Sequence, residues 1–205
     1  MATAFLSCQT GAEPTPKGSL PDIRNHQFTS KILPEMQATL APGDIIFRMG
    51  TDITSYMFAQ LNDTDKRYSH CGIANFEDGN WVVYHSIGGE FNPDQKMLRE
   101  PLEWFAAPNE AKKIGIYHPQ LDSIANNQML QVVKGWHGMQ IPFDMDFDLL
   151  TNDRMYCAEM VAKALIAGKQ DAKWLHVSKR GNLVYIDTED LAGASILTAS
   201  GTWDY

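Results

Sequence analysis

The chain has 205 residues, of which 44% are hydrophobic, and this is enough for one sizeable core. Its 17 Lys and Arg residues stand against 25 Asp and Glu residues, which gives a net charge of -8, and basic residues never form a block longer than two. This balance argues against nucleic acid as a partner. No apolar run approaches the roughly 20 residues that a membrane-spanning helix needs.

The three cysteines, at positions 8, 71 and 157, cannot all pair with one another, and none belongs to a Cys-x-x-Cys motif. We therefore expect neither a disulfide framework nor a cysteine-rich zinc site. A free reactive thiol is compatible with an oxidising or a reducing compartment, so cysteine usage does not decide where the protein resides.

Residues 1–22 are expected to be a flexible lead-in or the remnant of a targeting segment, because proline and glycine are frequent in them. The first eight residues end in Leu-Ser-Cys, as some bacterial lipoprotein signals do, but they lack a basic start and an apolar core of roughly 7–15 residues. A truncated signal would imply the bacterial cell envelope or periplasm, and its absence would imply the cytoplasm. Residues 23–205 are expected to form a single domain.

Helical and extended patterns alternate at the start of this domain. Residues 26–40 have apolar side chains at helical spacing, although Pro34 interrupts them. A Pro-Gly-Asp turn at residues 42–44 precedes residues 45–48, Ile-Ile-Phe-Arg, which predict a short buried strand. Residues 52–61 predict a helix with one apolar face.

A β-hairpin is predicted next. Residues 68–76 and 81–87 are strand-like, and the turn between them contains Asp-Gly, the strongest short hairpin signal. Closing the hairpin on this turn places Phe76 opposite Trp81, and the rest of the register follows from that pair.

This register puts His70 and His85 on one face of the hairpin, as diagonal neighbours with about 7–8 Å between their backbones. Gly72 stands opposite His85 and is expected to leave space there for another element. Cys71 points to the other face and is expected to pack in the core. Two histidines that meet on one face favour a functional site over a structural role.

Elements of mixed type follow the hairpin. Residues 113–117 and 184–186 predict strands, residues 121–139 a long helix, and residues 99–106 a mixed connector. The link at residues 138–148 carries alternating aspartates. It lacks the glycine and the glutamate of a calcium-binding loop, so calcium is not expected there.

Residues 152–168 predict a helix whose apolar residues recur at i, i+3, i+4, i+7 and i+8 from Cys157. Asn152 or Asp153 can cap its start, and Gly168 suits its end. Cys157 then lies in the first turn, where unpaired N–H groups and the helix dipole favour a thiolate. The alternative is a small buried residue on an amphipathic helix.

Cys157, His70 and His85 have the side chains of a cysteine nucleophile, a general base and a group that orients the base. This requires that they converge in space. The same side chains could instead bind zinc, with water or an aspartate as the fourth ligand, although their spacing matches no zinc motif. A domain that binds its ligand without chemistry is a third alternative.

Four motifs carry a family resemblance, namely Pro-Gly-Asp-Ile-Ile-Phe-Arg at 42–48, Ser-His-Cys-Gly-Ile at 69–73, Val-Tyr-His-Ser at 83–86 and Tyr-Cys-Ala-Glu-Met-Val at 156–161. In this order they resemble the YiiX-like proteins, a circularly permuted branch of the NlpC-type, papain-like cysteine hydrolases. The resemblance covers residues 42–168. It implies an α+β fold in which an antiparallel β-sheet or barrel packs against the N-terminal end of the cysteine helix.

Carried over to this sequence, the resemblance makes Cys157 the nucleophile and His70 the general base. His85 stands where such proteins often have a glutamate as the third member. A neutral histidine can orient an imidazole, but it stabilises the charged form less than a carboxylate would, so this position is a departure from the family pattern.

The resemblance also implies residues for substrate binding and for the oxyanion. Residues 138–144 resemble the family's Gly-x-Pro-Tyr-Asp element, with Phe143 in place of the tyrosine and Asp144 as the aspartate. Without that hydroxyl, Tyr156 or the backbone N–H of the cysteine would hold the oxyanion. Asp44, in the first motif, is a further candidate for substrate binding.

The activity implied is cleavage of an amide bond through an acyl-thioester, with a peptidoglycan stem peptide as the expected substrate. Permuted relatives similar to lecithin:retinol acyltransferase move acyl groups to or from lipids, so a lipid-directed acyltransferase or thioesterase is the alternative. Amide hydrolysis is favoured because no strongly amphipathic segment indicates a membrane-docking surface. The expected partner is a small peptide- or amide-containing substrate, without a cofactor or metal; membrane contact and oligomeric state stay open.

Overall fold

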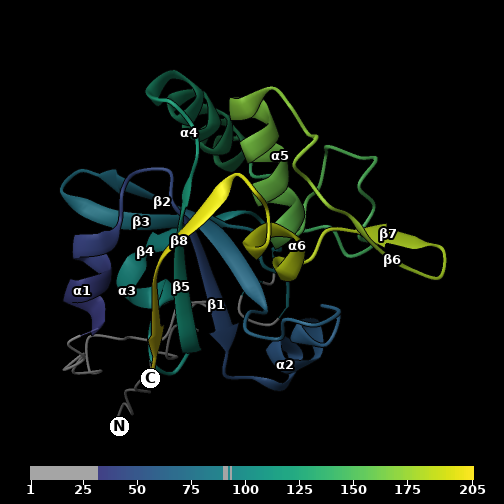
Figure 1. Ribbon diagram of the computed structural model, residues 1–205, viewed down its shortest axis with the longest axis horizontal. Coiled ribbons are helices and arrows are strands. Elements are labelled where there is room, and N and C mark those ends of the chain that lie inside the picture. The colour runs from purple at the N-terminus through teal and green to yellow at the C-terminus, as the bar shows by residue number, and fades with distance from the viewer. Residues whose placement is uncertain (1–31, 90–91, 93) are drawn as a thin grey trace, which may run out of the picture.

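The computed structural model describes residues 32–89, 92 and 94–205. The lead-in predicted for residues 1–22 and the first part of the helix predicted at 26–40 lie outside these ranges. In the described part of the chain, a six-stranded antiparallel sheet has the order β4-β3-β2-β1-β5-β8 (Figure 1). Its strands are β1 (Ile45–Gly50), β2 (His70–Glu77), β3 (Asn80–His85), β4 (Leu98–Pro101), β5 (Ala111–Pro119) and β8 (Leu197–Asp204).

Helices cover both faces of this sheet. They are α1 (Ile32–Thr39), α2 (Ile53–Ala59), α3 (Leu102–Phe105), α4 (Ser123–Gly138), α5 (Cys157–Lys169) and α6 (Thr188–Ala192), and a separate hairpin joins β6 (Ser178–Arg180) to β7 (Leu183–Tyr185). Helices α4 and α5 lie together on one side of the sheet, and α1 and α3 lie on the other (Figure 1). None of the described helices is both long and apolar enough to cross a bilayer.

Alternate side chains of β1 enter two different cores. Ile45 and Phe47 pack in the core of α4 and α5, whereas Ile46 packs in the core of α1 and α3. Successive side chains of a strand point to opposite faces, so helices on both faces bury all of them. The buried strand predicted at 45–48 is confirmed, and with it the α+β class and the antiparallel sheet.

The hairpin of β2 and β3 has the predicted turn and register. Asp78 and Gly79 both have positive φ, at 51° and 81°, as a two-residue hairpin turn requires. Phe76 pairs with Trp81 as predicted. Because side chains alternate along each strand, this pairing decides which residues of the two strands share a face.

The space predicted at Gly72 is occupied by the neighbouring strand. A Cβ atom at this position would lie 2.7 Å from Val83 Cγ1 and 3.0 Å from His85 Cβ. The expectation of room for another element is therefore wrong. The glycine instead allows β3 to approach β2 closely, next to the point where the two histidines meet.

The cysteine helix begins later than predicted. Tyr156 is its N-cap residue, and the Tyr156 N–H donates to Glu159 Oε2 at 3.2 Å. The predicted caps Asn152 and Asp153 lie before the helix. Cys157 is the first helical residue, so its predicted place in the first turn is confirmed.

The same helix also ends later than predicted. It continues to Lys169, and Gln170 takes the left-handed conformation with φ 55°. Gly168 lies inside the helix, where a Cβ atom would be 2.7 Å from the carbonyl oxygen of Ala125 on α4. This glycine is needed for close packing of α5 against α4 rather than for ending the helix.

Two strands of the sheet have no predicted counterpart. Strand β4 overlaps the start of the segment predicted as a mixed connector and pairs with β3, and β8 pairs with β5 at the other edge. Edge strands are short or polar and show little apolar alternation. Their place is therefore set by the strand beside them and not by a local pattern.

Candidate active site

Two imidazole rings meet on β2 and β3. His70 Nε2 lies 2.9 Å from His85 Nδ1, and the ring planes are inclined at 81°. His70 is 7% exposed and His85 is 1% exposed, so both are shielded from water. The diagonal contact predicted from the hairpin register is confirmed, and each ring holds the other in position.

A carboxylate stands behind the histidine pair. Glu100, on β4, places Oε1 2.9 Å from His85 Nε2. The ring N–H is not aligned well enough for a full hydrogen bond, so the contact is mainly electrostatic. Burial tends to raise the pKa of Glu100, but His85 and the charge of Arg48 outweigh burial and lower the pKa below its usual value. Glu100 is therefore ionised at neutral pH.

This series of contacts assigns the tautomers of both rings. An ionised carboxylate can only accept hydrogen bonds, so it favours the tautomer of His85 that carries its proton on Nε2. His85 Nδ1 then accepts from the Nε2–H of His70. The lone pair of His70 consequently lies on Nδ1, which is the ring nitrogen left to act as a base.

A buried guanidinium affects the charge of His70. Arg48 pairs with His70 across β1 and β2, and Arg48 Nη1 donates to the carbonyl oxygen of Phe105 at 3.0 Å. Its side chain lies over the Phe105 ring, 4.7 Å from the ring centre. Burial, the charge of Arg48 and the neighbouring His85 lower the pKa of His70 well below its usual range. His70 is thus uncharged at neutral pH and available as a base.

This low pKa predicts that the acidic limb of kcat/KM for amide hydrolysis lies below about pH 6.5. His70 is a base only while neutral, so lowering its pKa keeps it competent to more acidic pH. An Arg48→Met variant lacks the positive charge, raises the pKa of His70 and moves the limb to higher pH. Comparing pH–rate profiles of the two proteins tests this, and superimposable profiles would exclude the role of Arg48.

Cys157 is half-buried at the start of α5. A hydrogen bond from the Cys71 thiol lowers the pKa of Cys157; burial opposes this, and the backbone N–H groups of Cys71 and of the helix start lower it further. Burial raises the pKa of Cys71 well above its usual value. Cys71 is therefore a core thiol, as predicted, and it also supports the neighbouring sulfur.

The structure brings the three predicted catalytic side chains into one cleft of about 660 Å³. Cys157 reaches it from α5, while His70 and His85 reach it from β2 and β3. Glu100 and Arg48 line the same cleft. A thiol of lowered pKa and an uncharged imidazole in a common cleft are suited to nucleophilic attack on a carbonyl.

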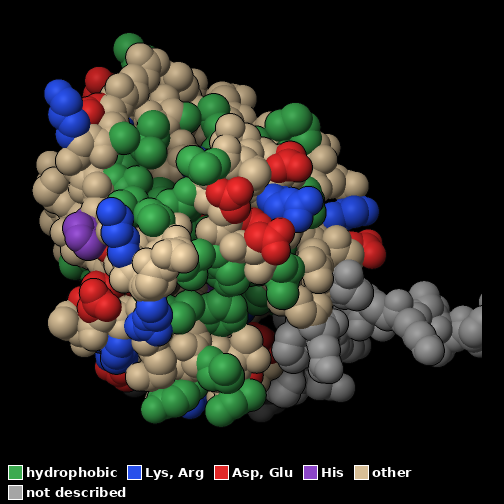
Figure 2. Space-filling model, turned by 90° about the vertical axis from the view of Figure 1, so that its right-hand side faces the viewer, with side chains coloured by type: hydrophobic (Ala, Val, Ile, Leu, Met, Phe, Trp, Pro, Cys, Tyr) green, Lys and Arg blue, Asp and Glu red, His purple; other side chains and the backbone are tan. Residues whose placement is uncertain are grey.

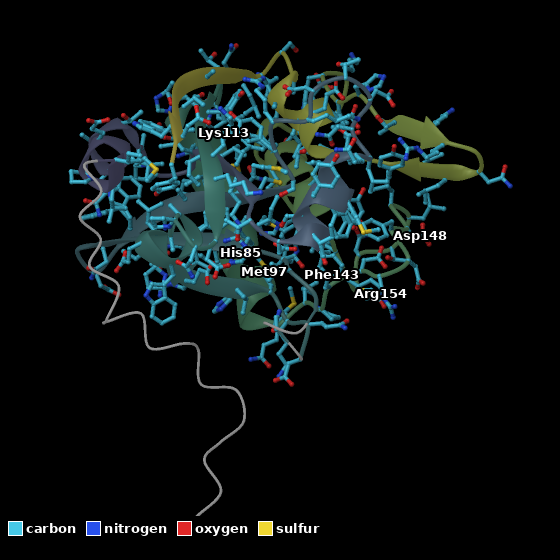
Figure 3. All side chains as sticks on the ribbon, turned by 90° about the horizontal axis from the view of Figure 1, so that it is seen from below. His85, Met97, Lys113, Phe143, Asp148 and Arg154 are labelled. Carbon is cyan, nitrogen blue, oxygen red and sulfur yellow. The ribbon has the colours of Figure 1, made fainter. Side chains whose placement is uncertain are left out.

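Two of the predicted substrate-binding residues also line the cleft. Phe143 comes from the loop between α4 and α5, and in Figure 3 it lies between His85 and Asp148, which is farther along that loop. The Tyr156 hydroxyl accepts a hydrogen bond from Ile186 N at 2.8 Å, and burial raises the pKa of Tyr156. Because this hydroxyl anchors the Ile186 segment, backbone N–H groups at the start of α5 are better placed to hold an oxyanion.

Asp44 and Asp144 are not among the described residues that line the cleft. Asp44 Oδ1 lies 2.6 Å from His118 Nδ1, and its other oxygen accepts from a backbone N–H of the preceding turn. Asp144 is fully buried and accepts from two backbone N–H groups of its own loop, at 2.9 and 2.7 Å. Each carboxylate orders a turn outside the cleft lining, so their predicted role in substrate binding stays a prediction that this geometry does not support.

Sequence reasoning does not single out Glu100 or Arg48. Arg48 ends the strand motif at 42–48, where an arginine has no distinctive signal. Glu100 lies in the segment predicted as a connector, and it reaches His85 only because β4 pairs with β3. Glu100 could have been predicted only from the register in which β4 pairs with β3.

The order of the elements defines the class of protein. The strands with the histidines precede the helix that carries the cysteine, and the sheet packs against that helix with the thiol at its N-terminal end. This is the arrangement of a papain-like cysteine hydrolase whose chain is circularly permuted.

The chain belongs to the family described as permuted papain-like amidase enzyme, YaeF/YiiX, C92 family, whose model matches residues 39–191. It is therefore a cysteine peptidase or amidase, as the four motifs predicted. Its fold is similar to the crystal structure of a protein described as metalloprotein YiiX from Escherichia coli O157:H7. The TM-score is 0.66 and the identity 19%, with 82% of this chain and 99% of that chain covered. No curated protein matches the chain.

Proposed function

We propose that the chain hydrolyses an amide bond through an acyl-thioester on Cys157. His70 Nδ1 takes the thiol proton, and the sulfur attacks the carbonyl carbon to form a tetrahedral oxyanion. Backbone N–H groups at the start of α5 stabilise that charge. The C–N bond then breaks, and the amine leaves with the proton from His70. Water attacks the thioester while His70 takes one of its protons, the carboxylic acid leaves, and the proton returns to the sulfur.

The observation that carries this proposal is the series of contacts from Glu100 through His85 to His70. When His70 accepts the thiol proton it becomes a cation in a buried place, which is costly without a nearby negative charge. Glu100 supplies that charge through the His85 ring. The chain therefore has a histidine, His85, where the family often has a glutamate, and the carboxylate of Glu100 lies one strand farther from the base.

The proposal is tested by trapping the acyl-enzyme. Protein quenched in acid during turnover of an amide is expected to carry the mass of the acyl group on the peptide that contains Cys157. Limited iodoacetamide is expected to alkylate Cys157 well before Cys71, whose thiol is buried and whose pKa is raised. Turnover without any acyl adduct on Cys157, even under single-turnover conditions, would refute the mechanism.

A Glu100→Gln variant is expected to lower kcat by about 100-fold with little change in KM. An aspartate that contacts the catalytic histidine directly is worth about 10⁴-fold in a serine protease, and Glu100 acts one ring farther away. The matched control is Glu103→Gln, three residues on and outside the cleft. Partial recovery of kcat in Glu100→Asp would support a positioning role, whereas a rise in KM alone would contradict it.

Metal binding is the alternative raised by the same side chains, and the YiiX structure is described as that of a metalloprotein. In this chain the facing nitrogens of His70 and His85 are 2.9 Å apart and hydrogen-bond to each other, so they do not both point toward a common ion. Among the described residues, no group of three or more His, Cys, Asp or Glu side chains is placed to hold a metal. We therefore assign no step to a metal.

The peptidoglycan stem peptide stays a prediction from the family resemblance. The alternative that the domain binds an amide without cleaving it is compatible with the same cleft. Formation of an acyl adduct on Cys157 would exclude that alternative, because binding alone forms no covalent bond.

A further inference from the structure

We infer that Ser86 is a positioning residue for the reaction, whose hydroxyl fixes the backbone just before Cys157 relative to the two histidines. This inference rests on the proposed function and adds to it a residue that does not touch the substrate. It is carried by a buried hydrogen bond between two segments that are far apart in the sequence, and by the other contacts of the segment that this bond holds.

The hydrogen bond joins the two halves of the site. Ser86 directly follows His85, the last residue of β3, and Met155 lies two residues before the nucleophile. Ser86 Oγ donates to the carbonyl oxygen of Met155 at 2.6 Å. Both residues are buried, so water does not compete for either partner. Ser86 is not among the described residues that line the cleft, and the mechanism assigns it no chemical step.

Apolar packing also brings the two segments together, but it fixes their distance less well. Met155 and Tyr156 pack in the core between the sheet and α5, and Figure 2 shows hydrophobic side chains in a hollow of the surface and beside it. Apolar contacts have no preferred direction, so they tolerate small displacements. A hydrogen bond weakens steeply as its geometry worsens. The Ser86 bond is therefore the contact that can define where Met155 lies against the hairpin.

The other polar contacts of this segment lead away from the hairpin. The Met155 N–H donates to the carbonyl oxygen of Pro142 at 3.0 Å, on the loop between α4 and α5. The Tyr156 N–H donates to Glu159 on its own helix, and the Tyr156 hydroxyl accepts from the segment that follows β7. Within the described part of the chain, the backbone of this segment thus reaches the histidine strands through Ser86.

The segment held by Ser86 carries both groups that the reaction needs from α5. One is the Cys157 thiol, and the other is the set of backbone N–H groups proposed to hold the oxyanion. Cys71 contacts the sulfur itself, whereas Ser86 holds the backbone from which the sulfur projects. A misplacement of about 1 Å between reacting groups costs up to about 100-fold in rate. A small shift of this segment relative to His70 is therefore expected to slow the reaction.

The test removes the hydroxyl with Ser86→Ala. This leaves the Met155 carbonyl oxygen buried without its donor, so the segment is expected to shift toward another partner. We expect kcat to fall about tenfold and KM to stay within about twofold, because Ser86 does not line the cleft. Both are measured with the L-Ala-γ-D-Glu amide of 7-amino-4-methylcoumarin, well below the melting temperature of each protein. A change in KM alone would overturn the inference.

Two further variants separate positioning from a general loss of stability. Ser200 Oγ donates to the carbonyl oxygen of Ile116 at 3.0 Å, which is the same kind of contact between β8 and β5, and neither residue lines the cleft. Ser200→Ala is expected to keep the kcat of the wild type. Ser86→Thr retains a hydroxyl and is expected to recover kcat to within about threefold of the wild type. A loss as large as that of Ser86→Ala in either variant would contradict the role of the Ser86 hydroxyl.

The pH profile separates this role from an effect on the adjacent histidine. The acidic limb of kcat/KM reports the protonation of His70, whose burial and neighbours Arg48 and His85 are retained in Ser86→Ala. The profile of the variant is expected to superimpose on that of the wild type after scaling. A displaced limb would show that Ser86 acts through His85, and would overturn the inference.

Acylation of the wild type separates this inference from the proposed function. It is followed by the mass of the Cys157 peptide with the same amide and with p-nitrophenyl acetate, a small activated ester. If Cys157 is acylated and Ser86→Ala keeps kcat within about twofold of the wild type, the positioning role is refuted and the proposed function stands. If neither compound acylates Cys157, the proposed function itself fails.

Discussion

Replacing Cys157 with serine is expected to lower kcat for amide hydrolysis by at least about 10⁴-fold. The pKa of His70 lies well below its usual range, so His70 is uncharged at neutral pH and able to accept a proton. The pKa of the Cys157 thiol is lowered, whereas a serine hydroxyl holds its proton far more tightly. The same imidazole therefore activates a serine hydroxyl far less well than a thiol.

The measurement is the initial rate of hydrolysis of a fluorogenic amide of 7-amino-4-methylcoumarin, with melting temperatures recorded in parallel. Cys157→Ser changes one atom of a half-buried side chain that lines the cleft, so the melting temperature should stay within a few degrees. Cys8→Ser is the matched control and should retain full activity. If Cys157→Ser kept more than a tenth of the wild-type kcat, another nucleophile would have to be sought.

The second large effect is expected for His70→Gln, with a loss in kcat of about 10³-fold. Glutamine fits the space of the ring and can still contact His85, but it has no nitrogen that accepts a proton at neutral pH. The thiol then loses its base, and the leaving amine loses its proton donor. The same variant should also react more slowly with iodoacetamide at neutral pH, because less of Cys157 is converted to thiolate when it reacts.

His118→Gln provides the control for this substitution. His118 also contacts a buried carboxylate, Asp44, but its own side chain is 44% exposed and does not line the cleft. Activity of this variant should match the wild type. A comparable loss in both variants would show that the effect of His70→Gln is a general consequence of losing a histidine and not of losing the base.

Local sequence patterns predicted much of this site, although its residues are far apart in the sequence. The Asp-Gly turn decides the register of the hairpin, and the register brings His70 and His85 together. Residues a few positions apart decide this contact, so it can be read without knowing the rest of the fold. The apolar stripe from Cys157 likewise predicts a helix with the thiol in its first turn.

Other expectations failed where distant contacts override local preference. Asn152 and Asp153 are good capping residues, yet the helix starts after Tyr156, whose hydroxyl is held by the Ile186 segment. Gly168 is a good terminator, yet packing against α4 keeps it helical. At each of these positions the local preference contributes about 1 kcal/mol to stability. Burial of a helix face contributes more than this, so packing decides where the helix begins and ends.

From the order of its residues alone, this chain specifies a histidine pair on one hairpin face and a thiol at a helix start, because both depend on neighbours within a few positions. Which charges surround them depends on strands that are distant in sequence. Glu100 reaches His85 through the pairing of β4 with β3, and Arg48 lies beside His70 through the pairing of β1 with β2. Those pairings form because two cores, one on each face of the sheet, bury the strands together. The partner of an edge strand cannot be predicted from a local sequence pattern.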